Sequence, residues 1–383
     1  MKWKILFAGD IFIKSSKQRI VSDTLKDLIN LHDLKVCNFE GPVKSESGKK
    51  IPKTGSYLEQ SENSTSLVKN VGFNIISLAN NHIYDYGYEG LKKTLEDFKD
   101  VLTVGAGENF DKAYQLVVFP LGHLKIGFLS YCEAEFGSLS ETKENNAGYA
   151  WINHTLVNRI ISESKKKVDF LIVQIHAGVE EIELPLPEWR MRYKQVIDLG
   201  ADIIIGHHPH IPQGWEFYKE KLIFYSLGNF YFDMKSNNPE WNRSFIISLD
   251  VENSSIVNYK VIPIFRENEE VYLNNDGTYS EYVNSLQKKL INNDYMQRIT
   301  EIAVELWNTR YKKYYATAMN GLNSNSFLYS LLRIIYQKLF QKKNEEEKFL
   351  LLLHNIRIES HRWIVQRALS YLYEEKINKN SKL

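Results

Sequence analysis

The sequence has few cysteines and almost no net charge. Its 383 residues include two cysteines, Cys37 and Cys132, which are too few for a disulfide scaffold and whose separation matches no zinc motif. Lys and Arg number 48 against 47 Asp and Glu, which leaves a net charge of +1. This balance provides no electrostatic footprint for nucleic acid or for an anionic membrane surface, so we expect no nucleic-acid partner.

Long hydrophobic runs are also missing from the sequence. The first ten residues contain two lysines and a short apolar run, which is too short for a signal-peptide core or a membrane span. No later stretch reaches about 18 uncharged apolar residues. Two cysteines are compatible with the cell interior. We therefore expect a cytoplasmic protein with no transmembrane segment.

Hydrophobic residues make up 43% of the chain and aromatic residues 13%, which is ample material for a buried core in two or three units. Up to about residue 265, short apolar runs alternate with amphipathic stretches, as in layered α/β domains. The predicted helices span residues 17–31, 61–70, 88–100, 152–164 and 187–199. Antiparallel pairing is predicted for 117–122 with 123–129 and for 221–226 with 244–251, which favours a mixed sheet or two packed sheets.

The composition changes after Phe265, where linker-like polar residues precede a region dominated by helical spacing. Helices are predicted over residues 282–290, 299–311, 327–340 and 349–373. We therefore expect an α/β domain over 1–265 and an α-helical C-terminal module over 266–383. The aromatic side chains of this module are interpreted as its core, and the alternative is a surface that docks a partner or a second subunit.

Polar side chains follow five of the apolar runs, at positions where strands are predicted to end. They are Asp10; Glu40; Asn80, Asn81 and His82; His176; and His207, His208 and His210. The carboxyl ends of strands in α/β sheets converge on a crevice, so these side chains are expected to meet. One histidine after a strand is usually a structural residue, but five strand ends carrying oxygen and nitrogen donors predict a divalent metal site.

The spacing of these donors adds detail. Side chains two apart in an extended segment point the same way, so His208 and His210 are predicted to face one metal cluster, with Pro209 fixing the backbone. The sequence leaves open whether His207 or His208 is the ligand. Glu40 can bridge two cations. Such a pair of cations would lower the pKa of a water molecule that they share and would bind a phosphoryl group between them. His82 remains to protonate a leaving oxygen.

Five motifs in this order resemble the bacterial capsule synthesis protein CapA family, also called the poly-γ-glutamate synthesis accessory family. They are Gly9-Asp10; Asn38-Phe39-Glu40-Gly41-Pro42; Ala79-Asn80-Asn81-His82 with Asp85, Gly87 and Thr94; His176-Ala177-Gly178-Val179-Glu180; and residues 200–210 followed by Tyr225-Ser226-Leu227-Gly228-Asn229-Phe230. The resemblance covers about residues 4–265, and five ordered motifs are far more specific than one. The C-terminal module lies outside it.

The resemblance implies a calcineurin-like metallophosphoesterase fold, which is a sandwich of two mixed β-sheets flanked by helices, with a dinuclear metal centre. It implies His82 as the acid beside the metals, and as ligands Asp10, Glu40, Asn81, His176, His208 and His210. Ordinary metallophosphoesterases have a ligand histidine where this chain has Phe12, and an aspartate where it has Glu40, so one metal position is expected to be weaker. Ligand chemistry fits Mn, Fe and Zn equally.

Four further residues are candidates for metal or substrate contact, each with a structural alternative. Asn80 is also typical of a turn, Glu180 can orient His176, and Asn229 can tie down its loop. His207 is the fourth.

Two functions follow as hypotheses. The first is a metal-dependent hydrolase, a phosphoesterase, that acts on a phosphorylated or polyanionic small molecule or polymer in the biosynthesis of capsule or cell-envelope polysaccharide or poly-γ-glutamate. The alternative is a non-catalytic accessory subunit of polymer synthesis or export, whose metal site is structural or binds polyanion. Such a subunit would contact a polymer synthase, or a second copy, through its C-terminal helices.

Overall fold

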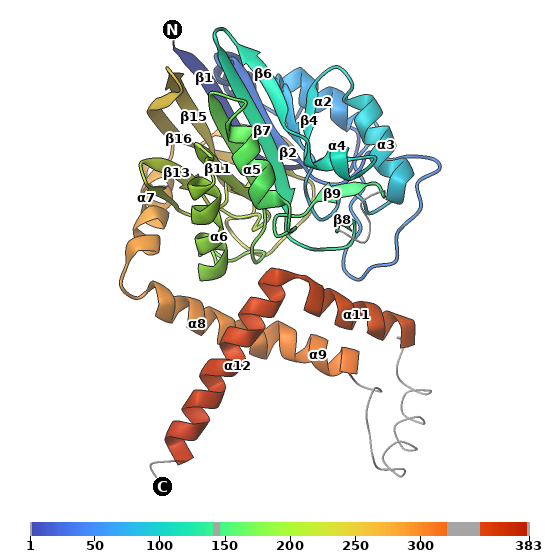
Figure 1. Cartoon of the computed structure of the whole chain (residues 1–383), viewed down its shortest axis with the longest axis vertical. Helices are drawn as coiled ribbons and strands as arrows, with labels where there is room; N and C mark the ends of the chain where they lie inside the picture. Colours follow the sequence, from blue (N-terminus) through green and yellow to red (C-terminus); the bar gives the residue numbers. More distant parts are fainter. Residues whose placement is uncertain (1, 141–145, 320–344, 381–383) are drawn as a thin grey trace. The chain divides into compact units, whose positions relative to one another are not determined.

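The computed structural model describes residues 2–140, 146–319 and 345–380, which form two compact units (Figure 1). Unit 1 comprises Met1–Ile51 and Tyr57–Tyr295, and unit 2 comprises Pro52–Ser56 and Met296–Leu383. The helix predicted over 327–340 lies outside the described residues.

The first sheet of unit 1 contains eight strands in the order β17-β16-β15-β1-β2-β3-β4, with β14 also paired to β1. Strands β1 to β4 are mutually parallel, whereas β15, β16 and β17 pair antiparallel, so the sheet is mixed. The bounds are β1 (Trp3–Phe12), β2 (Leu34–Phe39), β3 (Ile75–Ser77), β4 (Leu102–Val104), β14 (Asn229–Phe232), β15 (Arg243–Glu252), β16 (Ser255–Glu267) and β17 (Glu270–Leu273).

The second sheet contains six strands in the order β12-β13-β11-β10-β7-β6 and is also mixed. Its strands are β6 (Val117–Leu121), β7 (Leu124–Cys132), β10 (Phe170–His176), β11 (Ile203–His207), β12 (Trp215–Tyr218) and β13 (Lys221–Phe224). A small third sheet contains β5 (Ala106–Gly107), β8 (Ser138–Leu139) and β9 (Gly148–Ala150).

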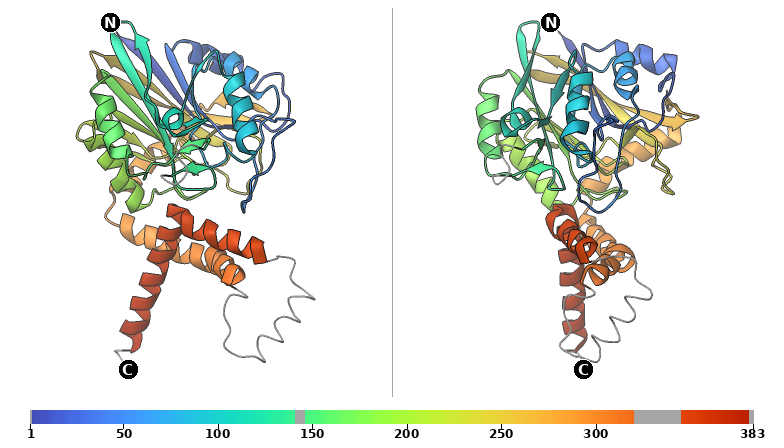
Figure 2. Two further views of the ribbon diagram at one scale, coloured as in Figure 1. Left: turned by 45° about the vertical axis from the view of Figure 1, so that its right-hand side comes forward. Right: turned by 90° about the vertical axis from the view of Figure 1, so that its right-hand side faces the viewer.

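The two large sheets pack face to face, and helices cover their outer faces (Figure 2). Side chains alternate along β1, so Ile5 and Phe7 enter the core between the sheets while Leu6 and Ala8 face the helix layer. That layer contains α1 (Asp23–Asn30), α2 (Ser64–Val71) and α3 (Gly87–Asp97), and the second sheet is covered by α5 (Val157–Lys165) and α6 (Pro187–Asp198). The predicted sandwich of two mixed sheets flanked by helices is confirmed.

One of the two predicted antiparallel pairs is confirmed and the other is wrong. Strands β6 and β7 form the expected hairpin. The segment 221–226 does not pair with 244–251, because β13 pairs with β11 and β12 in the second sheet. The chain crosses to the first sheet around Gly228, where β14 and β15 both pair with β1. Apolar alternation predicts a strand but not the sheet that receives it.

The domain boundary predicted at residue 265 falls inside β16, and unit 1 extends to Tyr295. Strand β17 continues the first sheet, and Val271 is fully buried there. Helix α7 (Gly277–Ile291) also belongs to unit 1, since Tyr279 and Leu286 join the core between the sheets. Another short helix of unit 1, α4 (Phe110–Tyr114), precedes β6.

Unit 2 is helical in its described parts, as expected for the C-terminal module. It contains α8 (Tyr295–Leu306), a π-helical turn (Trp307–Tyr311), α9 (Lys312–Met319), α11 (Glu345–Arg357) and α12 (Glu359–Asn380). Its core includes the buried side chains of Ile299, Tyr311, Ile358 and Ile364, and α9 packs on α11. Among the described helices, none has both the length and the apolar character that a membrane crossing requires.

The close crossing of β1 and the Gly228 turn yields a stability prediction. A Cβ on Gly9 would lie 1.8 Å from the carbonyl oxygen of Gly228, which also accepts a hydrogen bond from Asp10 N–H. We expect Gly9→Ala to lower the free energy of unfolding by about 1–3 kcal/mol or more, measured by urea denaturation, because backbone must move. Gly277→Ala is the control, since a Cβ there meets nothing within 4 Å, and equal losses in both variants would contradict the prediction.

Candidate metal centre

The carboxyl ends of strands from both large sheets converge on one buried group of side chains. The group contains Asp10, Glu40, Asn81, His82, His176, His207, His208, His210 and Asn229, each at most 9% exposed. Strands β1, β2 and β3 lead to the carboxylates, Asn81 and His82, while β10 and β11 lead to the other histidines. The structure therefore brings together the donors that the strand-end pattern singled out.

Asp10 lies at an irregularity of β1, where the register with β2 and β14 shifts. Its Oδ1 accepts a hydrogen bond of 2.8 Å from Asn38 Nδ2 and lies 3.1 Å from His207 Nδ1, while its Oδ2 accepts from His208 N–H at 3.2 Å. Burial alone would raise the pKa of Asp10, but the contact with His207 and the charge of nearby histidines outweigh burial and lower it. The side chain is therefore held as a carboxylate.

Glu40 is fully buried, and neither of its carboxylate oxygens has a hydrogen-bond partner among the described residues. The Nε2 atoms of His82, His176 and His210 lie 4.0, 4.0 and 3.7 Å from Oε1, beyond hydrogen-bond range. Burial, with the negative charge of Asp10, raises the pKa of Glu40 well above its usual range. A buried carboxylate without partners is costly unless a cation neutralises it.

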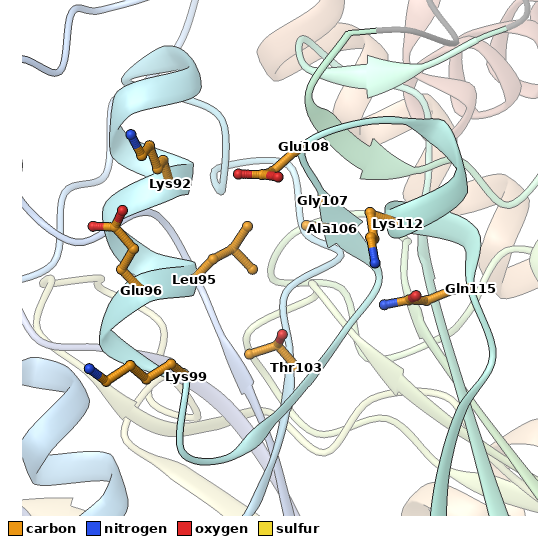
Figure 3. Close-up of a pocket in the computed structure, with 10 residues that line it drawn as sticks. All are labelled: Lys92, Leu95, Glu96, Lys99, Thr103, Ala106, Gly107, Glu108, Lys112 and Gln115. Atoms are coloured by element: carbon orange, nitrogen blue, oxygen red, sulfur yellow. The ribbon is translucent and has the colours of Figure 1, made fainter.

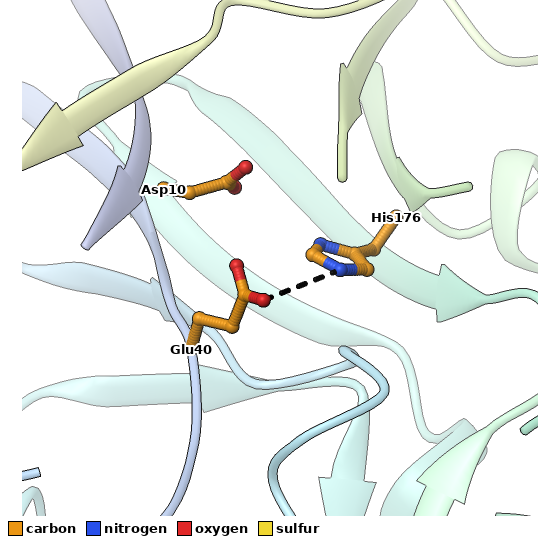
Figure 4. A group of neighbouring side chains, drawn as sticks. All are labelled: Asp10, Glu40 and His176. Atoms are coloured by element: carbon orange, nitrogen blue, oxygen red, sulfur yellow. Dashed lines mark ion pairs between the residues drawn. The ribbon is translucent and has the colours of Figure 1, made fainter. Parts of the chain in front are cut away.

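The spacing of these atoms fits a divalent cation. Bonds of about 2 Å from nitrogen and oxygen place two ligand atoms of one ion roughly 3–4 Å apart. Asp10, Glu40 and His176 each offer one ligand atom, and these atoms lie within 4.8 Å of one another (Figure 4). Carboxylate, imidazole and amide oxygen together are a donor set that suits borderline divalent metals.

His176 is the last residue of β10 and connects several donors. Its Nε2 lies 3.0 Å from Asn81 Oδ1 and 3.0 Å from His208 Nδ1, and its Nδ1 lies 3.2 Å from Asn38 Nδ2. Burial, together with neighbouring histidines, lowers the pKa of His176 well below its usual range and that of His208 to about 4. Both rings are therefore neutral at pH 7, which is the form that binds metals.

His208 and His210 reach the centre by a route that the sequence did not predict. Their φ angles are 96° and 61°, in the left-handed region that few side chains adopt, so the segment is not extended and the predicted alternation is wrong. The His208 backbone N–H donates to Asp10, which stabilises this conformation. Strained backbone of this kind typically persists where function requires it.

His210 is oriented by an amide and by aromatic rings. Its Nδ1 lies 3.0 Å from Asn229 Oδ1, which accepts the ring N–H and leaves Nε2 facing Glu40. The ring packs against Phe232 and Trp241 at centroid distances of 4.5 and 5.1 Å. Phe12, at the position where metallophosphoesterases have a histidine, belongs to the same apolar cluster and offers no ligand atom.

His82 is held by a carboxylate. Its Nδ1 lies 2.7 Å from Asp85 Oδ2, and Asp85 also accepts a hydrogen bond of 2.8 Å from the Leu58 N–H. Nε2 is therefore the atom that faces Glu40 and can exchange a proton at the centre.

The remaining candidates, Asn80, Glu180 and Asn229, differ in their surroundings. Asn80 binds backbone groups, since its Nδ2 donates to Phe39 O and its Oδ1 accepts from Gly41 N–H. Glu180 is exposed, and its charge contributes to the raised pKa of Glu40. Asn229 joins His210 to the loop before β15, because its Nδ2 donates to Trp241 O.

Asn38, which belongs to the second sequence motif, lies between Asp10 and His176. Two further buried residues of the centre were missed by the sequence pattern. Glu133 accepts a hydrogen bond from Gly178 N–H, and Glu135 accepts one from Asn81 Nδ2. Glu133 directly follows the apolar strand β7 and Glu135 lies two residues further on, so the rule used for the other strand ends would have identified them.

A separate hollow of about 330 Å³ lies between α3 and α4 (Figure 3). Lys92, Lys112 and Glu108 are among the side chains around it, and none of the candidate ligands lines it. The buried group of strand-end donors therefore lies elsewhere in unit 1 and does not open into this hollow.

The sequence profile described as bacterial capsule synthesis protein PGA_cap matches residues 4–234. The chain is 36% identical over 248 residues to the capsule biosynthesis protein CapA of Bacillus anthracis, a match that covers 61% of this chain and 60% of that protein. It is 30% identical over 272 residues to the PGA biosynthesis protein CapA of Bacillus subtilis, which covers 67% of this chain and 70% of that protein. The match thus spans less than two thirds of the Bacillus anthracis protein.

Among solved structures, the Haemophilus influenzae NAD nucleotidase is similar with a TM-score of 0.41 and 14% sequence identity. The alignment covers 76% of this chain and 63% of the nucleotidase chain.

The buried carboxylate of Glu40 predicts two effects of its replacement. The protein should become more stable in the absence of metal, and it should no longer be stabilised when metal is added. Glu40→Met removes a carboxylate that has no partner, so in EDTA we expect the variant to be more stable than the wild type by about 1–3 kcal/mol. Addition of Mn²⁺ or Zn²⁺ should raise the melting temperature of the wild type and leave the variant unchanged. Glu62→Met, at a surface ion pair with Lys44, serves as the control. An equal rise in the Glu40 variant and the wild type would contradict this prediction.

Proposed function

The chain belongs to the bacterial capsule synthesis protein PGA_cap family, and from this premise we propose that it is a metal-dependent phosphoesterase in the biosynthesis of a capsule or cell-envelope polymer. The observation that carries the proposal is Glu40, whose buried and unpartnered carboxylate faces three imidazole Nε2 atoms. Its surroundings supply ligands for cations and one acid in a single buried centre.

We propose that the ligands divide into two groups that meet at Glu40, where the ligand atoms of Asp10, Glu40 and His176 lie within 4.8 Å of one another. Asp10 and His210 lie on one side, with His210 Nδ1 3.6 Å from Asp10 Oδ2. Asn81, His176 and His208 form the other group, with separations of 3.0 Å. We therefore propose that these residues and Glu40 would hold two divalent ions, with Mn, Fe and Zn as candidates. Such ions would supply Lewis-acid chemistry, which neutralises phosphoryl oxygens and lowers the pKa of water.

His82 is proposed as the general acid. Asp85 accepts the hydrogen bond of Nδ1, so Nε2 is the ring atom that faces the centre and would give a proton to the leaving oxygen. Asn38 donates to Asp10, and Asn229 accepts from His210, so the proposed ligands keep their orientation before substrate arrives.

The proposed substrate is a phosphorylated or polyanionic small molecule or polymer. Because the net charge of the chain is +1, attraction of an anion must come from the ions of the centre rather than from the overall surface. Relatives named for capsule and PGA biosynthesis support a role in polymer production.

A second function is supported by the same names, which describe biosynthesis and not hydrolysis. In this alternative, the chain is an accessory subunit of polymer synthesis or export, and the centre is structural or binds the polyanion. Polymer production would then require the proposed metal ligands but would not require His82.

The proposed acid predicts a dependence on the leaving group. We expect His82→Ala to retain its metal content and to lose about 10²–10⁴-fold in kcat with an alkyl phosphate, whose leaving oxygen needs a proton. The loss should be far smaller with p-nitrophenyl phosphate, whose leaving group departs as an anion. Steady-state kinetics and elemental analysis of the same preparations measure both quantities.

His208→Ala is the companion variant, because it removes a proposed ligand and should lower metal content and both activities together. Equal losses of His82→Ala with both substrates would exclude the acid role. Absence of bound divalent metal in the wild type under every loading condition would exclude the phosphoesterase.

Polymer production in cells separates the two functions. If the chain is a hydrolase, strains that carry His82→Ala and His208→Ala should both show reduced polymer, measured after isolation from the cell surface. Normal polymer in the His82→Ala strain, together with loss in the His208→Ala strain, would favour the accessory subunit.

A further inference from the structure

Glu135 occupies a turn that sequence motifs do not single out. We propose that it is a positioning residue that presents the side-chain oxygen of Asn81 to the metal centre. The inference deepens the proposed function and rests on it, because it requires Asn81 to be a ligand.

The contacts of Asn81 assign different partners to the two ends of its amide. Nδ2 donates to Glu135 Oε1 at 3.1 Å, and Oδ1 lies 3.0 Å from His176 Nε2. All three side chains are buried, with exposures of 4% for Asn81, 7% for Glu135 and 1% for His176. The amide therefore turns its oxygen toward the proposed ligands and its nitrogen away from them.

With a metal bound, His176 would not impose this orientation. Its Nε2 would then be a ligand of the ion and would carry no N–H to donate to the oxygen of Asn81. A carboxylate only accepts, so Glu135 can face only the nitrogen end. Because the amide nitrogen has no lone pair for a metal, the wrong orientation would remove one ligand and direct two N–H groups at a cation.

The position of Glu135 is itself fixed by the fold. The buried Tyr149 of β9 bridges the turn that follows β7: its hydroxyl accepts a hydrogen bond of 2.8 Å from Glu135 N–H and donates one of 3.1 Å to Glu133 O. Glu133, two residues earlier, accepts from Gly178 N–H at 2.9 Å and so ties the turn to the loop that follows His176. This clamp sets the carboxylate of Glu135 before any metal binds.

The first test compares metal affinity in two variants of similar size. Glu135→Leu removes the acceptor, and we expect the Kd for Mn²⁺, measured by isothermal titration on the full chain, to rise about ten- to a hundredfold. Glu135→Gln keeps an acceptor oxygen and should recover most of the affinity. An unchanged Kd in Glu135→Leu would overturn the inference.

The second test isolates orientation from charge and folding. In Asn81→Asp, both ends of the side chain are oxygens, so either rotation presents a ligand. We therefore expect Glu135→Leu in the Asn81→Asp background to bind Mn²⁺ no more weakly than Asn81→Asp alone. The same loss in both backgrounds would overturn the positioning role, since it would show a general effect on the site.

The outcome also separates this inference from the function on which it rests. If Asn81→Ala weakens Mn²⁺ binding but Glu135→Leu does not, the ligand set stands and the positioning role fails. If Asn81→Ala binds Mn²⁺ as tightly as the wild type, Asn81 is not a ligand and both fail. Melting temperatures in EDTA, measured for every variant, confirm that the folded protein is being compared.

Discussion

The burial of Glu40 without a hydrogen-bond partner in the described part of the chain is the constraint around which the rest of the centre is arranged. A carboxylate removed from water destabilises the fold unless a proton or a cation neutralises it. Three imidazoles face it from β10, from the turn after β11 and from the turn after β3, at distances that leave room for an ion. The sandwich brings these elements together because the strands of both sheets end at the same edge.

A second layer of side chains fixes the direction of the first. Asn38 holds Asp10, Asp85 holds His82 and Asn229 holds His210, in each case through one hydrogen bond. Such partners decide which atom of an imidazole or a carboxylate faces the centre. All three holding residues come from strands or turns of the first sheet, whereas His210 follows β11 of the second, so the geometry of the centre depends on the packing of the two sheets.

Phe12 shows how this chain differs from ordinary metallophosphoesterases at one edge of the centre. Its side chain joins Leu58, Phe232 and Trp241 in an apolar cluster against which the His210 ring packs. The cluster forms a hydrophobic wall against the ring of His210. A ring held in this way loses little side-chain entropy when it binds an ion.

The sequence by itself determined most of the donors that meet in the buried centre, because apolar runs predict strands and the polar residues that follow them mark strand ends. It determined the sandwich through its resemblance to a known family. Only the tertiary structure decided that β13 and β15 belong to different sheets, that β17 and α7 complete unit 1, and that Glu135 faces Asn81. It also decided the backbone of His208 and His210. These features depend on contacts between segments far apart in the chain, which local periodicity does not encode.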